Sequence, residues 1–169
     1  MPKTITGLQE RLIAEAERQL VKGGYTAMTI RGIAKACGVA VGTVYNYFSS
    51  KEEFVASVLL VRWKKVLQAM RAATEMPGGS EKMLRCMYDQ LCGFIEQYRV
   101  LFHDEAAVAV FVTSVGRYHD VLRRQMAQIL RGCCQSDFEA EFVAESLLTW
   151  TVAGESFDEI YEVIRKICK

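Results

Sequence analysis

The chain has 169 residues and a formal net charge of +1, and its composition is 51% hydrophobic and 24% charged with only 2 prolines. This length allows one or two small domains with a buried core, and the apolar fraction excludes a disordered or collagen-like chain. The longest obvious apolar run, residues 106–112, is far shorter than the roughly 18 residues of a membrane span. The first residues lack a hydrophobic signal segment, so we expect a cytoplasmic protein without a membrane partner.

The charge is divided unevenly along the chain. Residues 1–74 carry 11 lysines and arginines against 5 acidic residues, a net charge of +6, whereas residues 75–169 carry 10 against 15, a net charge of −5. A basic front half is typical of a protein that binds a polyanion such as nucleic acid. The two halves meet at residues 76–80, a Pro-Gly cluster that favours the end of a helix.

Apolar residues recur at helical spacing through most of the chain. The first stripe covers residues 12–20 and ends at Gly23-Gly24, and further stripes cover residues 84–95, 121–130, 138–152 and 157–167. The sequence has no alternating run of β-branched residues bounded by turn signals, so no sheet is predicted. We therefore expect an all-α chain of eight or nine helices.

The most informative pattern follows the first helix. Thr29 is a suitable N-cap for a short helix through Cys37, and Gly38 comes next, where a tight turn requires a positive φ. A second short helix is predicted from about Val41 to Phe48. Two short helices joined by a glycine turn form a helix-turn-helix, whose second helix fits the major groove of DNA.

The start of the next helix carries two further signals. Ser50 and Glu53 have the spacing of a capping box, which predicts that a helix begins there. Lys51 falls in the first turn of that helix, where a positive charge opposes the helix dipole. A residue placed against this preference indicates another purpose, and a DNA phosphate is the expected partner.

The stretch from Gly38 to Phe54, GVAVGTVYNYFSSKEEF, resembles the signature of the TetR family of bacterial transcription repressors. The resemblance covers roughly residues 8–60. Two positions depart from the family's usual pattern, because Ala40 replaces a capping serine and Gln19 replaces an apolar residue. Upstream residues that stand at the family's spacing are Ala16, Gly24, Tyr25, Met28, Thr29, Ile33, Ala34 and Ala36.

The resemblance implies a three-helix helix-turn-helix DNA-binding domain over residues 1–50 and a helical effector-binding and dimerisation domain over residues 51–169. It implies a repressor that binds a palindromic operator as a homodimer and is released by a small apolar or aromatic effector. The helix over residues 51–74 is expected to transmit the effector's shift. Residues implied to contact bases or the adjacent backbone are Arg31, Val41, Gly42, Thr43, Tyr45 and Asn46. Residues implied to contact phosphates are Thr29, Tyr47 and Lys51.

The rear half supplies candidates for dimerisation and for effector binding. Two-fold pairing is expected because one helix-turn-helix reads only a few base pairs, and the last two predicted helices, residues 138–153 and 155–168, are unusually apolar. The interface candidates are Phe142, Leu147, Leu148, Thr149, Val152, Ile160, Val163, Ile164 and Ile167. The effector-pocket candidates are Trp63, Met87, Tyr88, Phe94, Tyr98, Phe102, Phe111, Tyr118, Met126 and Trp150. Ordinary core packing is the open alternative for both sets.

The remaining reactive residues leave other functions to consider. The histidines at 103 and 119 lack metal-site spacing, since adjacent helical residues point about 100° apart, and we expect neither a metal nor a cofactor. An enzyme is not expected, because the sequence shows no triad order, phosphate loop or paired carboxylates. The six cysteines are expected to be reduced, which leaves a thiol-based redox-sensing regulator open, with Cys133-Cys134 as the pair. A helical interaction adaptor without an effector also stays open.

Overall fold

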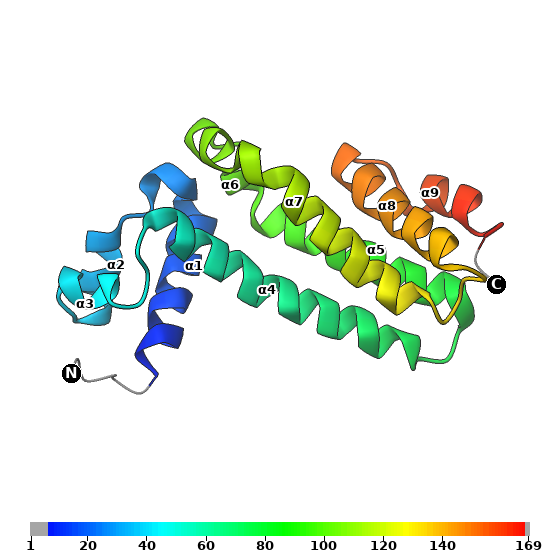
Figure 1. Cartoon of the computed structure of the whole chain (residues 1–169), viewed down its shortest axis with the longest axis horizontal. Helices are drawn as coiled ribbons and strands as arrows, with labels where there is room; N and C mark the ends of the chain where they lie inside the picture. The colour runs from blue at the N-terminus through cyan, green and yellow to red at the C-terminus, as the bar shows by residue number, and fades with distance from the viewer. Residues whose placement is uncertain (1–6, 168–169) are drawn as a thin grey trace. The chain divides into compact units, whose positions relative to one another are not determined.

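The computed structural model describes residues 7–167, except for the side chains of residues 108–118. The described residues form helices and no strand, in agreement with the predicted all-α fold (Figure 1). In chain order the helices are α1 (Leu8–Ala27), α2 (Ile30–Cys37), α3 (Val41–Tyr45), α4 (Lys51–Thr74), α5 (Gly79–Gln97), α6 (Arg99–Phe102), α7 (Glu105–Leu130), α8 (Asp137–Ala153) and α9 (Phe157–Ile164).

The first helix is interrupted near its end. Gly24 has a φ of 72° and a ψ of −170°, which are not helical, so α1 consists of two helical segments that meet at this residue. When the two segments are counted separately, the described helices slightly exceed the eight or nine expected. Within residues 7–167 no helix has both the length and the apolar character needed to cross a bilayer.

The chain folds into two compact units. The first contains the residues up to Arg62 together with Gln97–Val112, and the second contains Trp63–Glu96 and the residues from Thr113 onward. The first unit therefore includes α6, which comes after α5 in the sequence. The chain passes between the units three times, after Arg62, after Glu96 and after Val112. The predicted division into domains at residue 50 stays a prediction.

The core of the first unit joins α1 to α2 and α3. Leu12, Ala16 and Leu20 recur every four residues on α1 and are fully buried, which is the spacing of one face of a helix. The ring of Phe48, just beyond α3, meets the ring of Phe54 on α4 edge to face, with their centres 3.9 Å apart. This packing holds the short α3 in place despite its low intrinsic stability as an isolated helix.

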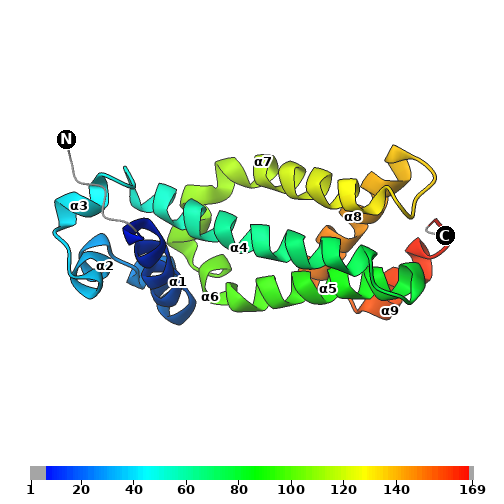
Figure 2. The same ribbon diagram turned by 90° about the horizontal axis from the view of Figure 1, so that it is seen from below.

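The second unit has its own core, to which the second half of α4, α5, α7, α8 and α9 contribute. Contacts with α5 hold α9 in place. The Tyr88 hydroxyl donates to the Glu155 carbonyl at 2.9 Å. The Arg85 guanidinium lies 4.1 Å from the centre of the Phe157 ring and donates to the Asp158 carboxylate at 2.8 Å. α8 and α9 also contact each other and lie side by side (Figures 1 and 2).

Candidate nucleic-acid interface

The turn between α2 and α3 forms as the sequence predicts. The Thr29 hydroxyl accepts a hydrogen bond from the Gly32 N–H at 3.0 Å, which caps the start of α2. Gly38 ends α2 with a φ of 68° and a ψ of 34°, the left-handed region that glycine enters at little cost. The Val39 N–H then donates to the Ala34 carbonyl at 3.0 Å and closes the turn.

The recognition helix is shorter than predicted. α3 ends at Tyr45 and does not continue to Phe48. The N–H groups of Asn46 and Tyr47 donate to carbonyls three residues earlier, at 3.3 and 2.9 Å, so the last turn is tightened into the 3₁₀ pattern. Ala40 begins the helix without a side-chain cap, as expected from its missing hydroxyl.

The two sides of α3 differ in burial. Val44 is 0% exposed and Phe48 is 2% exposed, so both anchor the helix to the core of the first unit. The side chain of Tyr45 is 52% exposed, and Asn46 beside it is also exposed. Of the other residues implied to contact DNA, Thr29, Arg31 and Gly42 are exposed, and Val41, Thr43, Tyr47 and Lys51 are half-buried.

Gln19 has a structural role that its departure from the family pattern did not reveal. Its side-chain carbonyl accepts the Thr29 N–H at 3.3 Å, and its amide donates to the Glu15 carboxylate at 2.8 Å. Hydrogen bonds from Arg18 and Gln19 lower the pKa of Glu15 to about 2. A polar side chain at position 19 therefore supports the start of α2 from α1.

The predicted capping box at α4 is only half formed. The Ser50 hydroxyl accepts the Glu53 N–H at 3.2 Å, as expected. The Glu53 carboxylate instead accepts the Ser49 N–H at 2.7 Å and the Ser49 hydroxyl. The predicted box required the Glu53 carboxylate to accept the backbone N–H of Ser50. Ser49 is the better partner because it offers two donors, its N–H and its hydroxyl.

Lys51 has a partner within the chain. Its ammonium group lies 4.1 Å from the centre of the Tyr25 ring, and the Tyr25 hydroxyl donates to the Glu52 carboxylate. Burial lowers the pKa of Lys51. This cation–π contact could not be predicted from local sequence, because Tyr25 is remote from Lys51 along the chain. The phosphate contact stays a prediction.

The residues predicted for the dimer interface fall into an exposed group and a buried group. Phe142, Val152 and Val163 are 44%, 70% and 59% exposed, and Thr149 is also exposed. The candidates buried in the core of the second unit are Leu147, Leu148, Ile160 and Ile164, and Ile167 packs partly buried against that core. α8 therefore has apolar residues both on its inner face and on its outer face.

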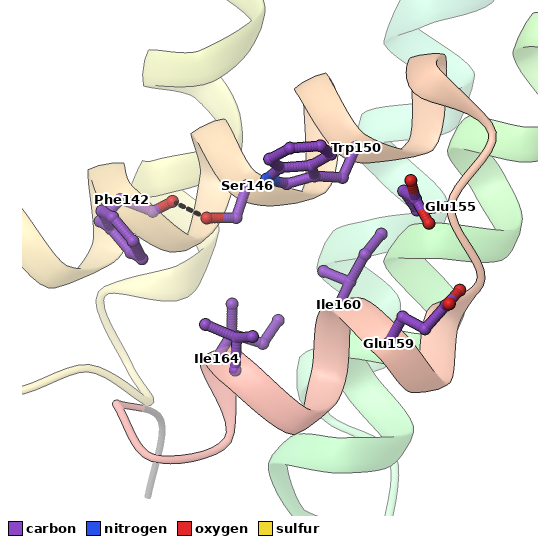
Figure 3. A pocket seen from close by; sticks show the side chains of 8 residues that line it. Phe142, Ser146, Trp150, Glu155, Glu159, Ile160 and Ile164 are labelled. Atoms are coloured by element: carbon purple, nitrogen blue, oxygen red, sulfur yellow. Dashed lines mark hydrogen bonds between the residues drawn. The ribbon is translucent and has the colours of Figure 1, made fainter.

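A groove of about 310 Å³ lies between α8 and α9. Its walls include Phe142 and Trp150 from α8 and Ile160, Val163 and Ile164 from α9. In Figure 3 the labelled side chains of the two helices face the space between them. Trp150 is 51% exposed there, so this predicted pocket residue belongs to the outer groove.

Five of the other effector-pocket candidates lie in the core of the second unit or pack against it. The Trp63 indole N–H donates to the Gln125 side-chain carbonyl at 2.8 Å, and its ring meets Phe94 edge to face. Met87 and Met126 are buried in the core of the second unit, against which Tyr88 packs. Tyr98 and Phe102 belong to the first unit, and the side chains of Phe111 and Tyr118 lie outside the described residues. The effector pocket stays a prediction.

The cysteines and histidines form no metal site among the described residues, where no group of three potential ligands occurs. The His103 ring nitrogen Nδ1 lies 2.8 Å from the Arg99 carbonyl, and His119 Nε2 lies 3.6 Å from the Glu145 carboxylate. The sulfur atoms of Cys133 and Cys134 are 4.0 Å apart, and both are thiols. A redox role for this pair stays a prediction.

The glycine turn, the buried inner side of α3 and its exposed outer side define a helix-turn-helix protein. Residues 12–58 match the family described as bacterial regulatory proteins, tetR family. The amino-terminal domain of this chain therefore belongs to the TetR family.

Relatives with curated descriptions match mainly this domain. The chain is 42% identical over 45 residues to the HTH-type transcriptional repressor KstR of Rhodococcus jostii, which is 27% of this chain and 21% of that protein. It is 28% identical over 102 residues to an uncharacterized HTH-type transcriptional regulator of Haemophilus influenzae, 60% of this chain and 47% of that one. The match thus spans less than half of these relatives' length.

Solved structures match the chain over nearly its whole length. A TetR transcriptional regulator from Legionella pneumophila superposes with a TM-score of 0.61 at 16% identity and covers 100% of both chains. A transcriptional regulator from Cytophaga hutchinsonii superposes with a TM-score of 0.69 at 17% identity, covering 95% of this chain and 92% of that one. These solved structures share the fold that residues 7–167 of this chain adopt.

Proposed function

We propose that this chain is a transcriptional repressor that binds a palindromic DNA operator as a homodimer and is released by a small apolar or aromatic effector. The observation that carries this proposal is the two-sided burial of α3 and the turn after it, where Val44 and Phe48 are buried and Tyr45 and Asn46 are exposed. An outward-facing short helix after a glycine turn is what entry into the major groove requires. The KstR relatives, which are named repressors, share this domain.

The charge around the helix-turn-helix supports a polyanionic partner. Residues 18–51 contain five lysines and arginines and no aspartate or glutamate. Arg31 and Lys35 are exposed on α2. Because phosphate contacts release counterions from DNA, binding that uses these cations weakens as the salt concentration rises.

The first test separates base contacts from phosphate contacts. Operator sequences are selected from a random duplex library with the full chain, and binding is then measured as a function of salt. Asn46→Ala should change the preferred sequence and cost about 1–3 kcal/mol on the original operator. Arg31→Ala should reduce the slope of affinity against salt, and Lys65→Ala, an exposed cation of the second unit, is the control that should leave it unchanged. The absence of any sequence-selective, salt-dependent binding by the wild-type chain would refute the proposal and favour the adaptor.

A second copy of the chain is the occupant proposed for the groove between α8 and α9. α8 has large exposed apolar residues in addition to its buried ones, whereas the exposed face of a helix at a monomer's surface is mainly polar. The exposed residues Phe142, Val152 and Val163 lie on these two helices, and pairing around a two-fold axis would cover such a patch on both copies at once. Two helices from each protomer then form a four-helix interface.

The test of this interface is the oligomeric state. Val163→Lys should shift the chain from dimer to monomer in sedimentation equilibrium, because two ammonium groups would enter an apolar interface. Leu60→Lys is the matched control, since Leu60 is 52% exposed but lies in the first unit. A wild-type monomer, or a Val163→Lys dimer of unchanged affinity, would show that the groove has another role.

Effector release is proposed for the domain over residues 51–169, with α4 as the connecting helix. Linkage requires that an effector which weakens operator binding is itself bound more weakly, by the same factor, in the presence of operator DNA. Titration calorimetry with a compound that displaces the operator, with and without the operator duplex, measures how much the operator weakens effector binding. The converse titration with the duplex measures how much the effector weakens operator binding. Unequal factors at equilibrium would contradict a single coupled equilibrium.

A further inference from the structure

The carboxylate of Glu17 on α1 contacts residues near two places where the chain leaves or re-enters the first unit. Glu17 Oε1 accepts a hydrogen bond from the Tyr98 hydroxyl at 2.8 Å and another from the Gln97 side-chain amide at 3.0 Å. The guanidinium Nε of Arg62 lies 4.0 Å from the same oxygen. All four residues belong to the first unit.

The positions of these partners along the chain are informative. Arg62 is the last residue of the first unit before the chain passes into the second, and Gln97 is the first residue after it returns. One oxygen of Glu17 therefore accepts a hydrogen bond from Gln97 and lies near Arg62, which stand at two of the three places where the chain passes between the units.

The hydrogen bond between Tyr98 and Glu17 is shielded from water on the Tyr98 side. Tyr98 is 0% exposed, and burial together with the Glu17 carboxylate raises the pKa of its hydroxyl, which stays a hydrogen-bond donor at neutral pH. A hydrogen bond to an ionised acceptor is shorter and stronger than a neutral one, and partial burial strengthens it further. This bond therefore resists bending between α1 and the start of α6.

A second carboxylate holds the other end of α6. Asp104 accepts the Thr26 N–H at 2.7 Å and the Thr26 hydroxyl at 3.1 Å, and it also caps α7 through the N–H of Ala106 at 3.0 Å. The short α6 thus lies against α1 between two polar attachments (Figure 2). At the break in α1, a Cβ on Gly24 would lie 3.3 Å from the Val100 carbonyl, so the backbones approach closely there.

We propose that Glu17 is a positioning residue that sets the direction of α1, and with it the spacing of the two recognition helices in the operator-bound dimer. This inference rests on the proposed function, since it concerns how a dimer reads two half-sites. α1 packs directly on α2, and α2 on α3, so a tilt of α1 moves the whole helix-turn-helix. One extra base pair between half-sites shifts the second site by roughly 3.4 Å and turns it by roughly 34°.

The experiment measures affinity against spacer length. An operator selected with the wild-type full chain is lengthened or shortened by one and two base pairs between its half-sites, and binding is measured at fixed salt. For the wild-type dimer we expect each one-base-pair change to cost about tenfold in affinity, because the two recognition helices cannot follow the shift. Glu17→Ala should reduce that penalty to about threefold while changing the affinity for the best spacer by less than about threefold.

Matched variants separate positioning from simple loss of stability. Glu17→Gln keeps an acceptor for the Tyr98 hydroxyl and should restore part of the spacer penalty. Glu10→Ala removes an exposed carboxylate from the same helix and should leave the spacer profile unchanged. If Glu17→Ala does not fold, Tyr98→Phe tests the same bond, because it removes the hydroxyl and keeps the ring.

The outcomes distinguish this inference from the proposed function. A wild-type chain that selects no operator overturns both. A wild-type chain with a narrow spacer preference, and a Glu17→Ala variant with the same relative penalties, overturns the positioning role alone, even if the variant binds every spacer more weakly. A flattened profile that Glu17→Gln partly restores supports it.

Discussion

Gly38 allows the cost of backbone conformation to be measured apart from packing. Its φ of 68° lies in the left-handed region, and a Cβ built on it would meet no atom within 4 Å. Gly38→Ala therefore adds a methyl group to open space, and the whole penalty comes from the backbone, about 1–2 kcal/mol. Gly38→Asn should cost less, because asparagine tolerates this region better than alanine.

Gly42 provides the matched control for this substitution. It lies on α3, has no positive φ, and a Cβ there would also meet no atom within 4 Å. Gly42→Ala should raise the free energy of unfolding by roughly 0.5–1 kcal/mol, because alanine favours the helix more than glycine does. The same variant should weaken operator binding if Gly42 approaches the DNA as proposed.

Urea unfolding at one fixed protein concentration measures both variants, since the apparent stability of a dimer depends on concentration. We expect the free energy of unfolding to fall for Gly38→Ala and to rise for Gly42→Ala, although the chemical substitution is the same. If Gly38→Ala and Gly42→Ala changed the free energy of unfolding equally, the left-handed turn would not be the reason for glycine at position 38.

Two further predictions concern pH and the docking of α9. Because hydrogen bonds from Arg18 and Gln19 lower the pKa of Glu15 from 4.5 to about 2 in the folded chain, its stabilisation is complete above pH 4.5 and is lost as the pH falls toward 2. In a pH series of urea unfolding, the difference between wild type and Glu15→Gln should close over this range, and a constant difference would contradict the assignment. Arg85→Ala removes both the contact with the Phe157 ring and the ion pair with Asp158, and should lower the free energy of unfolding by about 1 kcal/mol. Arg165→Ala, which loses a pair with Glu162 at the carboxyl end of α9, should cost roughly 0.3–0.5 kcal/mol at most, and equal losses would show that the α5–α9 contact is not specific.

The sequence by itself determined the features that depend on near neighbours in the chain. The Thr29 cap, the left-handed Gly38 and the four-residue spacing of Leu12, Ala16 and Leu20 all involve groups within a turn or two of one another. Their hydrogen bonds and periodicity can therefore be read from local residue types. The same locality made the helix-turn-helix pattern specific enough to indicate a family.

The tertiary structure alone decided which distant side chains share one environment. Tyr98 is 81 residues from Glu17, and Asp104 is 78 residues from Thr26, so no local pattern predicts either contact. The same reason divided the apolar residues of α8, where Leu147 is buried and Phe142 exposed although both are equally suited to a core. Side-chain chemistry states what a residue can bind, but only packing between remote segments determines which partner it meets.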